Sequence, residues 1–174
     1  LYGEPGSNAL SSLKIINLSE KEELKLVETI PVNVSQRVLQ LAREIGTEGR
    51  EGKSVGCLFV IGAEDKLDDY THQLIVNPFS GYPEVERNII DPSLEETVKE
   101  FSKIDGAFII KPDGTIKSAG TYIAISPETL EHHPGEGARH ASARGITAVT
   151  KCLAIAVSES TGRVSVYADG RRIL

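Results

Sequence analysis

Apolar residues follow two spacings along the chain, and each spacing predicts a type of element. Residues 33–45 place apolar side chains three or four positions apart, which predicts an amphipathic helix that stops at Gly46. The continuous run VGCLFVIG at 55–62 is short and rich in strand formers, so it predicts a buried strand. The run QLIVNPF at 73–79 predicts a second strand.

The middle of the chain predicts a helix and then a hairpin. The sequence SLEE at 93–96 is a capping box, so we expect a helix that starts there and ends near Ile104. The segments GAFIIK and TIKSAGTYIAIS follow, separated by the turn at 112–114, and this order predicts two paired strands.

The last quarter predicts a helix followed by strands. After a polar loop at 126–137, residues 138–151 predict a helix, and LAIAVS and RVSVYA predict strands. Asp169-Gly170 predicts another hairpin turn. Because helices alternate with strands on both sides of a hairpin-rich middle, we expect a single α/β domain with a central mixed β-sheet flanked by helices. We assign this domain to residues 31–174 and expect residues 1–30 to connect it to an upstream domain.

Composition is typical of a globular protein. The chain has 174 residues, of which 40% are apolar and 25% are charged, enough for one well-packed core. It has no apolar run long enough to cross a membrane, and no signal peptide is recognisable. Cys57 and Cys152 both fall in apolar segments, so we expect buried free thiols and a reducing cytoplasmic location.

Charge is unevenly distributed. The net charge of −6 argues against direct binding of nucleic acid through a broad basic face. Residues 135–174 carry six Lys and Arg against three Asp and Glu, a net +3, so residues 1–134 carry −9. The positive electrostatic potential that could attract an anion is therefore concentrated in the last quarter of the chain.

The stretch GEGARHASARG at 135–145 is the strongest phosphate signal. Arg139 and His140 stand at a predicted helix start, where backbone N–H groups, the helix dipole and a guanidinium can converge on a polyphosphate. An ordinary surface arginine beside a tight glycine turn is the alternative from local sequence alone.

Three other motifs are weaker. GREGKS at 49–54 resembles a P-loop, but Thr47 occupies the position of its first glycine and a strand follows where a helix is needed. Gly135 and Gly137 begin a dinucleotide fingerprint whose third glycine is replaced by His140. His132 and His133 are better explained as solvated loop residues than as metal ligands, since no third ligand is suitably spaced.

Acidic residues stand beside two predicted strands. Asp105 precedes the strand that begins at Gly106, and Ser158 and Glu159 follow another strand. Carboxylates at a sheet edge opposite a phosphate-binding helix could hold Mg²⁺ or Mn²⁺ for nucleotidyl transfer, whereas each acid taken singly could be an ordinary turn residue.

Taken in order, DGAFII, GARHASA and VSESTGRVSV resemble the diadenylate cyclase (DAC) domain family over residues 34–174. The marks of that family are a DGA motif, a G-T-R-H-R loop and a V-S-E strand end. The resemblance implies an enzyme that condenses two ATP molecules into cyclic di-AMP and two pyrophosphates. It also implies a metal-dependent reaction and a face-to-face homodimer, since this chain has one copy of each motif and offers one half-site.

The resemblance also implies roles for individual residues. Asp105 would bind the metal and help activate the ribose 3′-hydroxyl, and Glu159 would contact the metal. Arg139 and His140 would act on the phosphates. The remaining positions would contact nucleotide: Gly106, Ala107, Tyr122, Ile123, Gly137, Ala138 and Ser158, with Tyr122 and Ile123 near the adenine.

Two positions depart from the family pattern. Ala138 stands where Thr is usual, and Ala141 stands where a second Arg is frequent. Arg144, three residues further along, is a candidate replacement, and a distant, archaeal-type branch would explain the departures. The competing hypotheses are a module that binds ATP or cyclic di-AMP without efficient catalysis and a dinucleotide-binding oxidoreductase.

Overall fold

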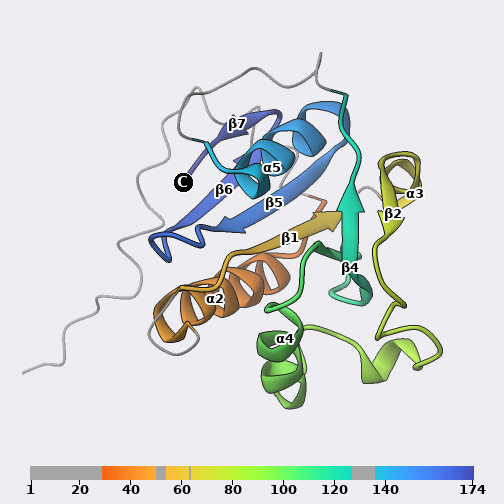
Figure 1. Cartoon of the computed structure of the whole chain (residues 1–174). Helices are drawn as coiled ribbons and strands as arrows, with labels where there is room; N and C mark the ends of the chain where they lie inside the picture. The colour runs from red at the N-terminus through yellow and green to blue at the C-terminus, as the bar shows by residue number, and fades with distance from the viewer. Residues whose placement is uncertain (1–28, 50–53, 63, 127–135) are drawn as a thin grey trace, which may run out of the picture.

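The computed structural model describes residues 29–49, 54–62, 64–126 and 136–174 (Figure 1). Residues 1–28, most of the GREGKS stretch, His132, His133 and Gly135 lie outside these ranges. Ile30, at the end of the predicted connector, is buried in the core beside the first described helix.

A mixed sheet forms the centre of the domain, as the sequence predicts. β1 and β3 pair in parallel, and every other neighbouring pair is antiparallel. The strand order is β2-β4-β3-β1-β5-β6-β7. The strands are β1 (Cys57–Gly62), β2 (Thr71–Gln73), β3 (Ala107–Ile110), β4 (Ile116–Ile123), β5 (Cys152–Val157), β6 (Val164–Ala168) and β7 (Arg171–Arg172).

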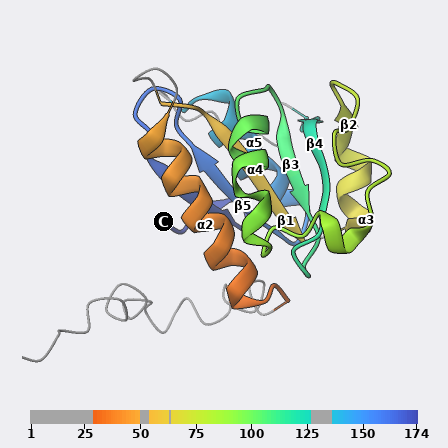
Figure 2. The same cartoon turned by 90° about the horizontal axis from the view of Figure 1, so that it is seen from below.

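Helices cover both faces of the sheet. α2 (Val32–Glu48) and α4 (Glu95–Phe101) lie on one face, and α5 (Ala138–Val149) lies on the other (Figures 1 and 2). The short α3 (Glu64–Leu67) lies beside β2. Within the described ranges, no helix is long and apolar enough to cross a membrane. The described part of the chain also contains the 3-10 turns η2 (Asp68–Tyr70), η3 (Glu84–Glu86) and η4 (Pro92–Leu94).

The sheet separates two apolar clusters because successive side chains of a strand point to opposite faces. On the α2 side, Phe59 stacks on Phe108 with ring centroids 5.0 Å apart. On the α5 side, Leu58 and Val60 pack in one cluster with Ile146. β1 and β5 are buried along their whole length, which explains why their sequences are continuous apolar runs.

Two expectations about the middle of the chain are wrong in detail. The strand predicted at 73–79 is instead β2, which ends at Gln73, and the apolar residue Val76 is 90% exposed. Ser93 does not cap α4: its backbone N–H donates to Asp91, which caps η4, and α4 starts only at Glu95. Asp91, which precedes Pro92, accepts the hydrogen bond of Ser93 instead, so Ser93 does not act as the cap of the predicted capping box.

Both cysteines are buried free thiols, as expected. Burial raises the pKa of Cys57 and of Cys152 to about 12, and Arg139 opposes the increase at Cys57. Neither thiol forms an appreciable thiolate near neutral pH.

A contact between two glycine backbones joins α2 to the turn between β5 and β6. A Cβ added at Gly46 would lie 2.2 Å from the carbonyl oxygen of Gly162, and Gly162 has φ +69°. That turn carries Glu159, so the contact fixes a candidate site residue relative to α2.

The Gly46→Ala variant should therefore be destabilised, although Ala is the better helix former by about 1 kcal/mol at an exposed position. Overpacking against the Gly162 carbonyl should lower the free energy of unfolding by about 1–3 kcal/mol. Chemical denaturation measures this change. Gln36→Ala, at an exposed position of α2, is the control and should stay within about 0.5 kcal/mol of wild type. A Gly46→Ala protein more stable than wild type would contradict the contact.

Candidate functional site

Strand directions bring the predicted site segments to one edge of the sheet. β1 and β3 are parallel, so Gly56 and Asp105, which precede them, lie at the same edge. β5 is antiparallel to β1, with Cys57 opposite Val157, so the residues that follow β5 reach this edge as well. β4 is antiparallel to β3, which brings Tyr122 to the same edge.

Arg139 connects two of these segments. It is the second residue of α5, and its Nη1 donates to Oε2 of Glu159 at 2.8 Å. Its Nη2 donates to Oδ1 of Asp105 at 3.4 Å. The side chains of Asp105 and Glu159 are 92% and 71% exposed, so both carboxylates face solvent. Two acids far apart in sequence thus converge on one guanidinium.

Gly56 makes room for this arrangement. A methyl group added there would lie 2.7 Å from Nη1 of Arg139 and 2.8 Å from Cβ of Glu159. The guanidinium lies directly against the backbone at the start of β1, where any side chain would displace it. Sequence analysis did not single out Gly56, although an isolated glycine within an apolar strand run is a signal for close approach.

Gly106 is required by both its conformation and its surroundings. Its φ is +102°, and a Cβ would lie 2.6 Å from the backbone of Gly120 and of Thr121. Ala107, which follows, pairs with Thr121 and is buried. The DGA segment therefore lies tightly against the end of β4, which leaves the Asp105 side chain exposed at the sheet edge.

The predicted phosphate loop leads into the N-terminus of α5. Gly137 is the N-cap residue, and no side chain among the described residues caps the helix there. Gly137 and Ala138 are both exposed, and a Cβ at Gly137 would meet nothing within 4 Å. Amide groups of the first turn, with the positive end of the dipole, are thus available to an anion.

His140 faces the sheet side of this helix start. Its ring is edge-on to Tyr167, with centroids 6.2 Å apart. Burial lowers its pKa, and the nearby Arg172 and Arg139 act in the same direction, while Glu136 opposes them. His140 is therefore mostly neutral at neutral pH in the absence of a bound anion.

Ser158 lies in a compact turn after β5. Its hydroxyl accepts from the N–H of Thr161 and is 3.1 Å from the hydroxyl of Ser160. Its own backbone N–H donates to Arg163. The predicted nucleotide contact of Ser158 thus belongs to a residue that also shapes the turn carrying Glu159.

The two predicted adenine neighbours differ in exposure. Tyr122 is 48% exposed and packs against His72 on β2, with ring centroids 4.8 Å apart. Ile123 is buried in the cluster on the α5 side. Only Tyr122 therefore presents its side chain to a ligand, while Ile123 can contribute backbone groups.

Arg144 is engaged elsewhere. Its guanidinium forms a paired contact with Glu136 and lies over the ring of Tyr167. Sequence analysis singled out neither Glu136 nor Tyr167, because a pairing across a helix start and a strand leaves no periodic signal.

The donor set at this edge suits a hard cation. Asp105 and Glu159 supply carboxylate oxygens, which Mg²⁺ and Mn²⁺ prefer. The described residues contain no group of three or more His, Cys, Asp or Glu side chains arranged to hold a metal. Two carboxylates fit an ion of the kind that completes its coordination with water and substrate phosphates.

The chain is similar to several known proteins. The family described as DAC, DisA bacterial checkpoint controller nucleotide-binding, matches residues 44–172. A diadenylate cyclase of Methanocaldococcus jannaschii is 37% identical over 179 residues, covering 98% of this chain and 57% of the relative. A diadenylate cyclase of Haloferax volcanii is 38% identical over 141 residues, covering 81% of this chain and 51% of the relative. Both sources are archaea, and the chain spans little more than half of each relative.

A solved structure supports the fold. A hypothetical membrane spanning protein from Bacillus cereus superposes with a TM-score of 0.59 at 21% sequence identity, covering 79% of this chain and 61% of that one. The predicted α/β fold with a central mixed sheet is thus confirmed. The DGA, ARH and VSE segments all lie within the matched range, and in the structure Asp105 and Glu159 both contact Arg139. This chain belongs to the DAC nucleotide-binding family.

Proposed function

We propose that this chain is the catalytic domain of a diadenylate cyclase, which converts two ATP molecules into cyclic di-AMP and two pyrophosphates. The observation that carries the proposal is the convergence of Asp105 and Glu159 on Arg139 at the N-terminus of α5. Membership of the DAC family and two relatives named diadenylate cyclase support it.

The reaction needs one new bond and one broken bond at each α-phosphorus. The 3′-hydroxyl oxygen of one ATP attacks the α-phosphorus of the other, and the bond to the pyrophosphate oxygen breaks. The proton of the hydroxyl must leave as the bond forms. Asp105 is the candidate to accept this proton or to orient the hydroxyl, because its carboxylate is exposed at the sheet edge.

Phosphate oxygens would be held by the start of α5. The amides at Gly137 and Ala138 and the guanidinium of Arg139 offer donors on one side of the site. His140 adds a donor whose charge depends on its surroundings. As negative charge collects on the departing pyrophosphate, these groups stabilise it more than they stabilise the ground state.

Asp105 and Glu159 are the residues that would hold a metal ion, Mg²⁺ or Mn²⁺. When bound, such an ion supplies charge neutralisation for the phosphates and polarises the α-phosphate. Before nucleotide binds, Arg139 contacts both carboxylates and so holds them at one place.

Adenine recognition is assigned to the end of β4. Tyr122 offers an exposed ring against which a purine can stack, and His72 supports that ring from β2. The backbone groups of Ile123 would give the polar contacts. Gly106 keeps this strand end close to Asp105.

A module that binds nucleotide with little catalysis is the second candidate. Ala141 provides no guanidinium where the family often has a second one, and Arg144 is paired with Glu136. Losing one charge-assisted contact to a phosphate costs about 1.5–3 kcal/mol, which is one to two decades in binding or rate.

Incubation with ATP and Mn²⁺ or Mg²⁺, followed by separation of the products, tests the proposal. Wild-type protein should release pyrophosphate and cyclic di-AMP in a ratio of two to one. Asp105→Asn keeps the shape but loses the charge, so its turnover should fall by about a hundredfold or more, or about 2.7 kcal/mol. Nucleotide binding without pyrophosphate release would favour the binding module, and activity of Asp105→Asn within a few-fold of wild type would remove Asp105 from the mechanism.

Gly56→Ala tests the position of Arg139. The added methyl group would force the guanidinium and Glu159 apart, so ATP affinity measured by calorimetry should fall by about tenfold while cooperative thermal unfolding persists. Ser54→Ala, two residues earlier, adds no atom and is the control. Unchanged ATP affinity in Gly56→Ala would show that the observed guanidinium position is not the one that binds phosphate.

Assembly follows from the chemistry, since each chain offers one half-site. Two chains should face one another with the reacting atoms about 3–3.5 Å apart. Specific activity should therefore rise with protein concentration wherever the chains are largely unpaired. Sedimentation at the same concentrations identifies that range, and activity strictly proportional to concentration across a purely monomeric range would rule out the face-to-face mechanism.

A further inference from the structure

An ion pair spans the start of α5. Glu136 precedes the N-cap residue, and Arg144 lies two turns into the helix. Nη2 of Arg144 donates to Oε1 of Glu136 at 2.8 Å, and its Nε donates to Oε2 at 3.3 Å. The two side chains are only 19% and 11% exposed. This side-on, bidentate geometry fixes both side chains in one orientation.

Tyr167 on β6 forms the floor beneath the pair. Its hydroxyl donates to Oε1 of Glu136 at 3.3 Å, and the central carbon of the Arg144 guanidinium lies 5.6 Å from its ring centroid. The ring of His140 meets the same ring edge-on. One buried aromatic ring therefore contacts the loop before the helix, the helix itself and a candidate phosphate-binding side chain.

The other side of Arg144 reaches the β6–β7 turn. Its Nη1 donates to the carbonyl oxygen of Gly170 at 3.4 Å, and the N–H of Gly170 donates to the hydroxyl of Thr147 at 3.2 Å. A Cβ at Gly170 would lie 2.9 Å from Cβ of Ala148, so turn and helix are in close contact. Arg144 is thus held from the sheet side as well as by Glu136.

We propose that the Glu136–Arg144 pair, seated on Tyr167, is a positioning device that sets the backbone at Gly137 and the ring of His140 for the phosphates. This inference rests on the proposed function and assigns its residues a further role. It replaces the hypothesis that Arg144 takes the place of the second family arginine.

The charges around Arg144 favour a positioning role for this residue over direct contact with phosphate. If Arg144 turned to a phosphate, the nearly buried carboxylate of Glu136 would lose its cation, and an unpaired buried charge is strongly destabilising. The phosphate would also approach that carboxylate. With the pair intact, Glu136 is neutralised, and Arg139 at the helix start faces the ligand.

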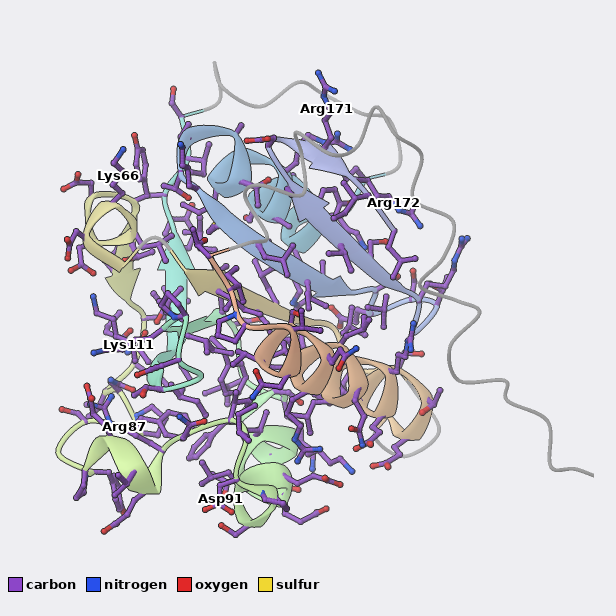
Figure 3. The ribbon with its side chains drawn as sticks, turned by 180° about the vertical axis from the view of Figure 1, so that it is seen from behind. Lys66, Arg87, Asp91, Lys111, Arg171 and Arg172 are labelled. Carbon is purple, nitrogen blue, oxygen red and sulfur yellow. The ribbon has the colours of Figure 1, made fainter. Side chains whose placement is uncertain are left out.

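Glu136 also acts on the charge of His140. Among the described residues, the charged and titratable groups around this imidazole are Glu136 before α5, Arg139 on α5, Tyr167 on β6 and Arg172 on β7. Figure 3 shows Arg171 and Arg172 on β7, far across the molecule from Lys66. Glu136 raises the pKa of His140 against the effects of burial and of the two arginines. Neutralising Glu136 should therefore lower that pKa further.

The test measures the affinity of 3′-deoxy-ATP, which lacks the attacking hydroxyl, by calorimetry with Mg²⁺. Glu136→Gln and Arg144→Met should each weaken binding by about tenfold, because each leaves a partner unpaired. The double variant Glu136→Leu/Arg144→Met should recover affinity to within a few-fold of wild type, since an apolar pair can replace a buried ion pair. Lys151→Met, which removes one positive charge from an exposed position just before β5, is the control for charge alone.

A phosphate-binding Arg144 gives the opposite pattern. Glu136→Gln would then free the guanidinium and leave affinity equal or tighter, and the apolar double variant would bind as weakly as Arg144→Met. Either result overturns the proposal. The double variant also keeps the test valid if a single variant unfolds.

Titration of His140 by NMR gives a readout independent of catalysis, with His140→Gln to identify the signal among four histidines. Glu136→Gln should lower the pKa of His140, and Lys151→Met should change it less. If wild-type protein binds no 3′-deoxy-ATP, the proposed function fails. The titration of His140 still tests whether the Glu136–Arg144 pair acts on this side chain. A His140 pKa that Glu136→Gln leaves unchanged would then overturn the proposal as well.

Discussion

The site depends on two ion pairs that the guanidinium of Arg139 forms with Asp105 and Glu159. Asp105 precedes β3 and Glu159 follows β5, and two carboxylates brought to one edge would repel each other without a cation between them. Both acids are largely exposed, so these ion pairs contribute little to the stability of the fold. Weak ion pairs are also easily exchanged, so in the proposed function Arg139 would be able to turn from a carboxylate to a phosphate.

Close approach of neighbouring groups to the backbone of glycine residues makes that arrangement possible. Gly56 lies under the guanidinium, Gly106 lies against β4, and Gly46 meets Gly162 behind the Glu159 turn. None of these glycines supplies a functional group. At each of them, the absence of a side chain leaves space for a candidate site residue, or for the turn that supports it, to approach the backbone. The parallel pairing of β1 with β3 then aligns their starts, so the site forms where the two strands begin.

Much of the fold could be predicted because the burial of an element determines the spacing of apolar residues in its sequence. β1, β3 and β5 are buried on both faces and therefore appear as apolar runs, and α2 shows one apolar stripe. The same logic failed at 74–76, where exposed apolar residues resemble a strand. The three site motifs were identifiable because each keeps its residues adjacent in sequence. Gly56 and the Glu136–Arg144–Tyr167 cluster were missed because their roles are set by neighbours distant in sequence.

The two buried thiols have a practical consequence. Cys57 and Cys152 are the only cysteines in the chain, and both are enclosed and remain protonated. A cysteine introduced at any exposed position would therefore be the single reactive thiol of the native protein. Fluorescent or spin labels could be attached there without first removing the native cysteines, so the proposed pairing of two chains could be tested by distance measurements in an unaltered core.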